Sequence, residues 1–495
     1  MCLLLLLCVA VAGCHKPSTK SAGPVELRIG LGTAASSRDS ALEGIGALLF
    51  SESLLVRQTD GRTVPGLATS WQWQDGGRTL RLQLKEDVRF HDGSLLTSEH
   101  VVQLLKQNID SDGQELGFAS VTGVSAAGLR TVVVTLSQPD FFLLPELTGL
   151  KIVRPDAPDI ATGPFKIVSR SPVFEAVRFD NYHGGTPAIE RVRVSTFASQ
   201  RAAWTALLRG EVDALQEVSR EIIEFASRAS SVRTYRSLQS FYIPLVLNQQ
   251  HPLLGKIEVR RALNEAIDRD AIVASGMGGH AQVAQDPIWP LHWAYSPPTE
   301  PQRPDQANAE RRMDAVGLKR GSDRSGGGMA PRFTVRCLFL TNDPMYERIA
   351  LMLQRQLFAV GVNLVLEPAD LQNLQVRANA GDFDTLLARA NAGRSLDFTY
   401  RFWHSADSQA SVMWRTGYRG VDGLLDQLRA STTDDEARTV VGELRHRFRN
   451  DVPAIFLAWP QITRAINSRF DVGTSNEHDP FAKIWEWRPT ETRHR

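Results

Sequence analysis

The chain has 495 residues, of which 42% are hydrophobic, with 56 basic against 55 acidic side chains. This length exceeds what one hydrophobic core usually supports, so we expect two or three lobes. The balanced charge gives no overall attraction toward nucleic acid or anionic lipid, the basic runs are short and scattered, and no nucleic-acid-binding motif accompanies them.

The amino terminus differs in kind from the rest of the chain. Leu3–Val11 is an apolar run of the length of a signal-peptide core, too short to span a bilayer as a helix. It ends in Val11-Ala12-Gly13-Cys14, which resembles a lipobox, the cleavage and acylation site of bacterial lipoproteins. We therefore expect a signal peptide over residues 1–13, a lipid anchor at Cys14 and a flexible tether through residue 24. The alternative is a buried hydrophobic segment that happens to contain a cysteine.

The first strand and the loop after it form a candidate ligand site. Glu26–Leu31 alternates between polar and apolar residues and predicts a strand, and an apolar helical pattern follows from Leu42 onward. Between them lies a loop of small and hydroxylic residues that includes Thr33 and Ser36. Open α/β sheets bind ligands at the carboxyl ends of their strands, so both side chains are candidate ligand contacts; a plain loop is the alternative.

A more informative stretch runs from Pro65 to Val102. Leu80, Leu82 and Leu84 alternate with polar residues, the period of a half-buried strand, and Asp75-Gly76-Gly77 predicts a tight turn before it. Thr97 predicts the cap of a helix that begins near Ser98. Nothing in this stretch is catalytic by itself.

The residues themselves resemble the signature region of solute-binding protein family five, the oligopeptide-, dipeptide- and nickel-binding receptors of ABC importers. The matching runs are L-A-x-S-W, D-G-G-R-T-L, K-E-D-V-R-F-H-D-G and L-T-S-E-H-V-V, with His100 where the family usually has an acidic residue. The resemblance continues over nearly the whole mature chain, at Ala161–Ile167, Arg209–Ala214, Glu258–Arg269 and Val452–Trp459.

The resemblance implies an α/β fold of the periplasmic-binding-protein kind (type II, cluster C-like), with two lobes and an extra subdomain in lobe one. Lobe one is expected over residues 25–247, with the inserted subdomain at about 51–155. Lobe two is expected over 248–457, and residues 458–495 should return to lobe one. Phe241–Asn248 and the strand near Ile455 should cross between the lobes and provide a hinge.

The nature of the solute depends on one loop. In peptide-binding members, a strand that ends in F-D is followed by a Trp and then by an Asp that pairs with the peptide amino terminus. Here Gly381–Asp384 matches the strand, but the following loop has no Trp, and its only acid, Asp397, comes late. Arg389 and Arg394 occupy the loop instead; either they are solvated, or they face the cleft and bind carboxylate or phosphate. If Asp397 does not reach the cleft, free-amine dipeptides should bind poorly, because a buried unpaired ammonium is costly.

These considerations predict one binding site and no catalytic one. The candidate ligand-binding residues are Thr33, Ser36, Tyr242, Trp289, Arg389, Asn391, Arg394 and Trp403, with the aromatic rings stacking on the solute. We find no paired nucleophile and base, phosphate loop or metal-ligand spacing, although His280 and His292 share a loop, so we expect no cofactor, no metal and no enzyme activity.

By resemblance, the chain should be a monomeric, lipid-anchored receptor on the periplasmic or cell-surface face of a bacterial membrane. It would close on a short peptide or a similar small solute and deliver it to an ABC permease and its ATPase. An anionic non-peptide solute (opine, sugar acid or metal chelate) is the alternative, and a hydrolase is a weaker one.

Overall fold

The structure is a computed structural model that describes residues 24–32, 35–110, 116–171, 173–226, 228–297, 302–322, 329–405, 414–473 and 479–490. The expected signal peptide, Cys14 and Thr33 lie outside these residues. Ser36 falls in a helix, but its side chain is outside the description.

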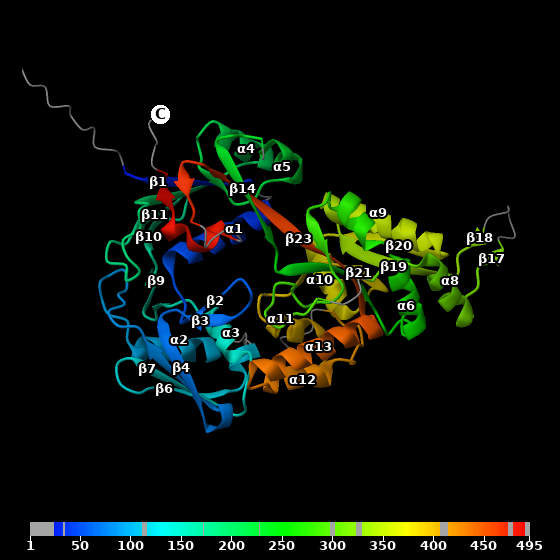
Figure 1. Ribbon diagram of the computed structural model, residues 1–495, viewed down its shortest axis with the longest axis horizontal. Coiled ribbons are helices and arrows are strands. Elements are labelled where there is room, and N and C mark those ends of the chain that lie inside the picture. The colour runs from blue at the N-terminus through cyan, green and yellow to red at the C-terminus, as the bar shows by residue number, and fades with distance from the viewer. Residues whose placement is uncertain are drawn as a thin grey trace, which may run out of the picture.

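A single sheet of 13 strands runs through both lobes, with the order β10-β11-β12-β1-β13-β23-β15-β21-β19-β20 along its main path (Figure 1). These strands are β1 Glu26–Leu31, β10 Phe165–Ser169, β11 Phe174–Arg178, β12 Arg191–Thr196, β13 Ala214–Leu215, β15 Phe241–Leu247, β19 Phe333–Leu340, β20 Val362–Ala369, β21 Thr385–Leu387 and β23 Ala454–Asn467. Beside the path, β14 (Val232–Leu238) and β16 (Ala281–Val283) pair with β23, and β22 (Ala390–Asn391) pairs with β15.

Lobe one is built around β1 and its neighbours. Leu27, Ile29 and Leu31 are at most 1% exposed, so the alternation in the sequence correctly predicted the buried face of β1. The helices of this lobe are α1 Ala35–Phe50, α4 Gln200–Leu208 and α5 Arg220–Ala226. A C-terminal 3₁₀ helix, Pro480–Glu486, packs Phe481 and Ile484 into the same core. The end of the chain is therefore part of lobe one, which also holds the short strands β24 (Phe470–Asp471) and β25 (Arg488–Pro489).

The inserted subdomain has a core and a sheet of its own, with strand order β4-β5-β7-β6. Its elements are β2 Leu55–Arg57, β3 Thr63–Pro65, β4 Ala68–Gln74, β5 Thr79–Leu84, α2 Ser98–Asp110, β6 Val121–Ala126, β7 Thr131–Leu136, α3 Leu143–Leu147, β8 Val153–Arg154 and β9 Ala157–Ala161. Helix α2 begins at Ser98 as predicted. His100 Nδ1 accepts the Thr97 N–H at 3.2 Å and lies 2.9 Å from Thr97 Oγ1, so this histidine caps the start of the helix from its third position.

Lobe two covers its part of the sheet with helices. Its elements besides the strands above are α6 Ile257–Ala266, α7 Arg269–Ala271, α8 Gln306–Ala315, α9 Pro344–Ala359, α10 Leu371–Ala380, α11 Asp397–Trp403, α12 Asp422–Ala430, α13 Asp434–Asp451 and the short strands β17 Gly321–Ser322 and β18 Met329–Ala330. Helix α9 leads through Gly361, whose φ is +85°, into β20. The buried face of α6 includes Val259, Leu263 and Ala266.

Two chain segments cross side by side between the lobes (Figure 1). One is β14 followed by β15, and the other is the long strand β23. The first residues of β23 pair with β15 in lobe two, and its last residues pair with β14 and β13 in lobe one. We predicted a return strand in this place, but the observed strand continues to Asn467 and bridges both lobes without a break.

Candidate ligand-binding site

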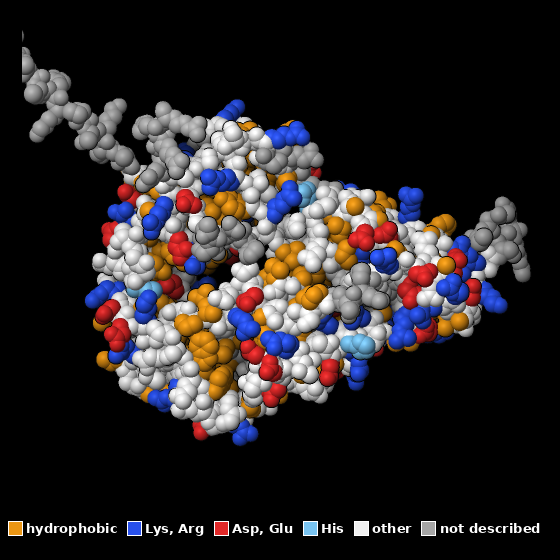
Figure 2. Space-filling model, viewed as in Figure 1, with side chains coloured by type: hydrophobic (Ala, Val, Ile, Leu, Met, Phe, Trp, Pro, Cys, Tyr) orange, Lys and Arg blue, Asp and Glu red, His pale blue; other side chains and the backbone are white. Residues whose placement is uncertain are grey.

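The space between the two lobes is hollowed near the centre of the face shown in Figure 2, and hydrophobic side chains gather on both sides of the opening. The crossing strands limit how far the lobes can separate on one side.

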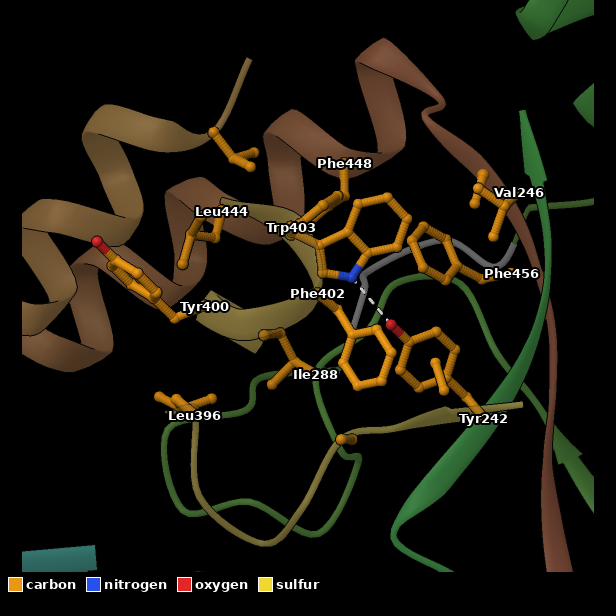
Figure 3. Close-up of a cluster of buried hydrophobic side chains, with 14 of the residues drawn as sticks. Tyr242, Val246, Ile288, Leu396, Tyr400, Phe402, Trp403, Leu444, Phe448 and Phe456 are labelled. Carbon is orange, nitrogen blue, oxygen red and sulfur yellow. Dashed lines mark hydrogen bonds between the residues drawn. The ribbon is translucent and has the colours of Figure 1, made fainter. Parts of the chain in front are cut away.

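Tyr242 and Trp403 meet inside the core of lobe two (Figure 3). Trp403 Nε1 donates a hydrogen bond to the Tyr242 hydroxyl at 2.9 Å, and the two side chains are 3% and 1% exposed. The Phe456 ring lies within 5.7 Å of both, between ring centroids, and burial raises the pKa of Tyr242. In this structure the two rings pack against each other and against Phe456, so their stacking on a solute stays a prediction.

The loop between β21 and α11 separates its two arginines. Arg389 is exposed, and its guanidinium carbon lies 4.5 Å from the centroid of the Phe241 ring. Arg394 is 29% exposed and lies 5.8 Å from the ring centroid of Trp289, which is buried. Asn391 is exposed, and its side-chain oxygen accepts the Gly393 N–H at 2.9 Å, so it shapes the loop. Of the predicted residues, the structure therefore brings Arg394 and Trp289 together, as it does Tyr242 and Trp403.

Asp397 is engaged inside the protein. It is 5% exposed, accepts a hydrogen bond from the Ser395 hydroxyl and lies 3.8 Å from Arg401 one helical turn away. A buried carboxylate with an internal donor and a nearby cation is poorly placed to meet a solute ammonium. The partly exposed charged group of this loop is therefore the Arg394 guanidinium, and not the Asp397 carboxylate.

Two charged residues that the sequence did not single out complete this region. Arg464, on the crossing strand β23, places Nη2 3.1 Å from one carboxylate oxygen of Asp479, just before the C-terminal 3₁₀ helix. The other oxygen of Asp479 lies 3.8 Å from Arg394 Nη2. Burial lowers the pKa of Arg464. Burial also raises the pKa of nearby Glu217, and the positive charges of Arg464 and Arg389 offset only part of that rise. We name Arg394, Arg464 and Asp479 the arginine–aspartate cluster.

A second hollow lies between the inserted subdomain and lobe two, which we name the tryptophan pocket. Its volume is about 650 Å³, and it is lined by three tryptophans and several polar residues: Arg62, Trp71, Trp73, Asp140, Phe141, His292, Trp293, Ser395 and Thr432 among them. Burial lowers the pKa of His292 to about 3, with help from the Arg62 and Arg57 charges. At the edge of this pocket, a Cβ atom on Gly61 would lie 2.1 Å from the Arg394 carbonyl oxygen. The subdomain thus touches the loop of lobe two that carries Arg394.

Within the described ranges, no group of three or more His, Cys, Asp or Glu side chains could hold a metal ion. No helix in those ranges has the length and apolar character needed to cross a membrane.

Comparison with known proteins shows the family to which this chain belongs. Residues 62–410 match the model of the bacterial extracellular solute-binding proteins, family 5. The chain is 26% identical over 418 residues to a probable D,D-dipeptide-binding periplasmic protein of Escherichia coli, covering 78% of each chain. It is 24% identical over 366 residues to the nickel-binding periplasmic protein of the same organism, covering 68% of this chain and 69% of that one.

Two solved structures share the fold. A putative peptide-binding protein from Clostridium difficile superposes with a TM-score of 0.82 at 16% identity, covering 94% of this chain and all of that one. The NikA protein of Brucella suis, in complex with Fe(III)-EDTA, superposes with a TM-score of 0.79 at 20% identity, covering 94% and 99%. Proteins with this fold therefore hold chemically different solutes, so the fold alone does not select one.

Proposed function

Because this chain belongs to the bacterial extracellular solute-binding proteins of family 5, we propose that it is the receptor of an ABC importer. The receptor captures a short peptide or a similar small solute between its two lobes and delivers it to a membrane permease with its ATPase. The family consists of binding proteins, and hydrolysis is the weaker alternative. A turnover assay on a panel of peptides and glycosides separates the two.

The observation that carries this proposal is the pair of crossing segments. The strand β23 and the segment β14–β15 join the lobes, and charged groups from both lobes meet in the arginine–aspartate cluster beside them. Two lobes joined in this way can rotate about the crossing segments. A solute that contacts both lobes then favours the closed arrangement, because it adds contacts that only that arrangement has.

A specific observation favours the second candidate, an anionic non-peptide solute such as an opine, a sugar acid or a metal chelate. Asp397 is buried and engaged with Ser395 and Arg401, whereas Arg394 is half-buried in the region between the lobes. A solute carboxylate would find a planar, bidentate partner there. A solute ammonium would have to find its carboxylate elsewhere, for example at Glu217.

The lipid anchor and the location of the receptor are proposed from the amino-terminal sequence. Acylation at Cys14 would hold the monomer at the periplasmic or cell-surface face of the membrane, with residues 15–24 as a tether. Growth in the presence of labelled palmitate, followed by isolation of the protein, tests this. Label in the natural protein and none in a Cys14→Ser variant is the expected result, and equal label in both would contradict it.

Native mass spectrometry of the protein purified from its own envelope tests the main proposal. We expect an adduct of constant mass that is lost on partial unfolding and that rebinds on titration. Absence of any adduct, together with no binding in a solute screen, would contradict the receptor function.

A further inference from the structure

We propose that Arg394 and Arg464 form an anion site that Asp479 fills in the free protein, and that a carboxylate of the solute replaces Asp479 on binding. This inference rests on the proposed function and names the solute class as a carboxylate-bearing anion. It also assigns a role to the C-terminal segment, which supplies an internal stand-in for the solute.

Asp479 fits only one of its two arginines well. One carboxylate oxygen lies 3.1 Å from Arg464 Nη2, an ordinary distance, but the other lies 3.8 Å from Arg394 Nη2, whereas charge-assisted bonds of this kind are usually about 2.7–2.9 Å long. The cause is its attachment, since it precedes the helix Pro480–Glu486 and accepts the Phe481 N–H at 3.3 Å. Phe481 is buried in the core of lobe one, which holds the backbone in place. A free carboxylate has no such tether and can approach both guanidinium groups.

The three residues of the cluster come from different parts of the molecule. Arg394 belongs to the loop of lobe two, Arg464 to the crossing strand β23 and Asp479 to the C-terminal segment of lobe one. They are 29%, 11% and 23% exposed, so Asp479 can turn toward water while its backbone stays in place. An anion held between Arg394 and Arg464 would therefore link lobe two to the crossing strand.

Among the described residues, three buried donors in or near the cluster lack a hydrogen-bond partner. They are Nε of Arg57, Nε1 of Trp289 and Nε of Arg464. Trp289 lies beside Arg394, and the charge of Arg394 is close enough to lower the pKa of Arg57. Buried donors are normally paired, so unpaired donors beside two arginines fit a solute rich in acceptor oxygens. The raised pKa of Glu217 adds to this, because a carboxyl that is harder to ionise balances the arginines less well.

Succinate is a suitable probe, with succinamide as its uncharged match in shape. Binding is measured by isothermal titration calorimetry at constant ionic strength on the natural protein and on Asp479→Asn, Arg464→Met and Arg170→Met. The Asn side chain keeps the oxygen that accepts the Phe481 N–H and removes the competing charge. Arg170 is 59% exposed and pairs with Asp159, outside the cluster, which makes it the control.

We expect D479N to bind succinate at least fivefold more tightly than the natural protein, and R464M to bind it at least twentyfold more weakly. R170M should match the natural protein, and succinamide should bind to none of them. The proposal is overturned if D479N binds no more tightly, if R464M is unchanged while folded by circular dichroism, or if succinamide binds as well as succinate.

The outcome for the proposed function is separate. If the co-purified solute is neutral or cationic, the anion site is wrong while the receptor function stands. If no solute is found by mass spectrometry or by screening, the receptor function itself fails.

Discussion

The Phe142 ring of the inserted subdomain packs edge-on against the Tyr400 ring of lobe two, with centroids 5.8 Å apart and planes at 72°. Phe142 is fully buried and belongs to the core of lobe two. Two residues before it, the buried Asp140 accepts hydrogen bonds from Arg429 Nη2 at 2.7 Å and Nε at 2.9 Å. The Phe141 N–H donates to the Arg429 carbonyl at 2.8 Å. The subdomain is thus fastened to lobe two at this corner.

We expect Arg429→Met to lower the free energy of unfolding by about 3 kcal/mol, because it leaves the Asp140 carboxylate buried without its cation. Urea unfolding followed by circular dichroism measures this. The control is Arg438→Met, which removes an exposed pair with Asp435 at 3.0 Å and should cost less than about 1 kcal/mol. Equal losses in the two variants would show that the corner contact contributes nothing special to stability.

The approach of Gly61 to Arg394 gives a second test. An alanine at Gly61 has both a positive φ of +86° and a Cβ that would clash with the Arg394 carbonyl oxygen, whereas Gly93 has φ +90° and no atom within 4 Å of an added Cβ. Gly93→Ala should therefore show only the backbone cost of about 1–2 kcal/mol. Gly61→Ala should lose about 1–3 kcal/mol more, from overpacking. Thermal unfolding of both variants measures the difference, and similar losses would contradict the close contact.

Tyr242→Phe tests the assignment of Tyr242 and Trp403 to the core. Loss of the hydroxyl leaves the buried Trp403 Nε1 without its acceptor, which should cost about 1–3 kcal/mol of unfolding free energy. Affinity for the co-purified solute, measured by calorimetry, should be unchanged. A loss of affinity with unchanged stability would return Tyr242 to the ligand-binding residues.

His292 should make stability depend on pH. Its pKa is lowered from 6.5 to about 3 in the folded protein by burial, so between these values the unfolded chain binds a proton that the folded chain does not. Stability therefore falls as the pH falls below about 6.5. His292→Asn keeps an acceptor for the Ala294 N–H, which His292 Nδ1 now accepts at 3.1 Å, and removes the titration.

Between pH 7 and pH 5 the natural protein should lose about 2 kcal/mol more than His292→Asn, as measured by urea unfolding at both pH values. His91 also has a lowered pKa, but it is present in both proteins and cancels in the comparison. Parallel losses in the two proteins would mean that His292 does not stay neutral on folding.

The fold could be predicted in outline because its signals are local. The alternation within Glu26–Leu31 and that of Leu80, Leu82 and Leu84 each follow from neighbouring residues, and both faces are buried as expected. The site could be predicted only in part. Arg394 was recognised because it lies in a loop that departs from the family pattern.

Arg464 and Asp479 were missed because they reach Arg394 from distant parts of the chain, and no local pattern marks either one. The contact between Tyr242 and Trp403 could not be predicted for the same reason. Their mutual hydrogen bond joins residues 161 positions apart, and an isolated aromatic residue looks alike in a core and in a binding site.

The central claim is that two lobes close on a solute. Small-angle X-ray scattering of the purified protein, first stripped of its solute and then saturated with the solute recovered by native mass spectrometry, tests it most directly. We predict a smaller radius of gyration and a shorter maximum dimension on saturation. Scattering curves that superimpose at a solute concentration shown by calorimetry to saturate the protein would contradict closure.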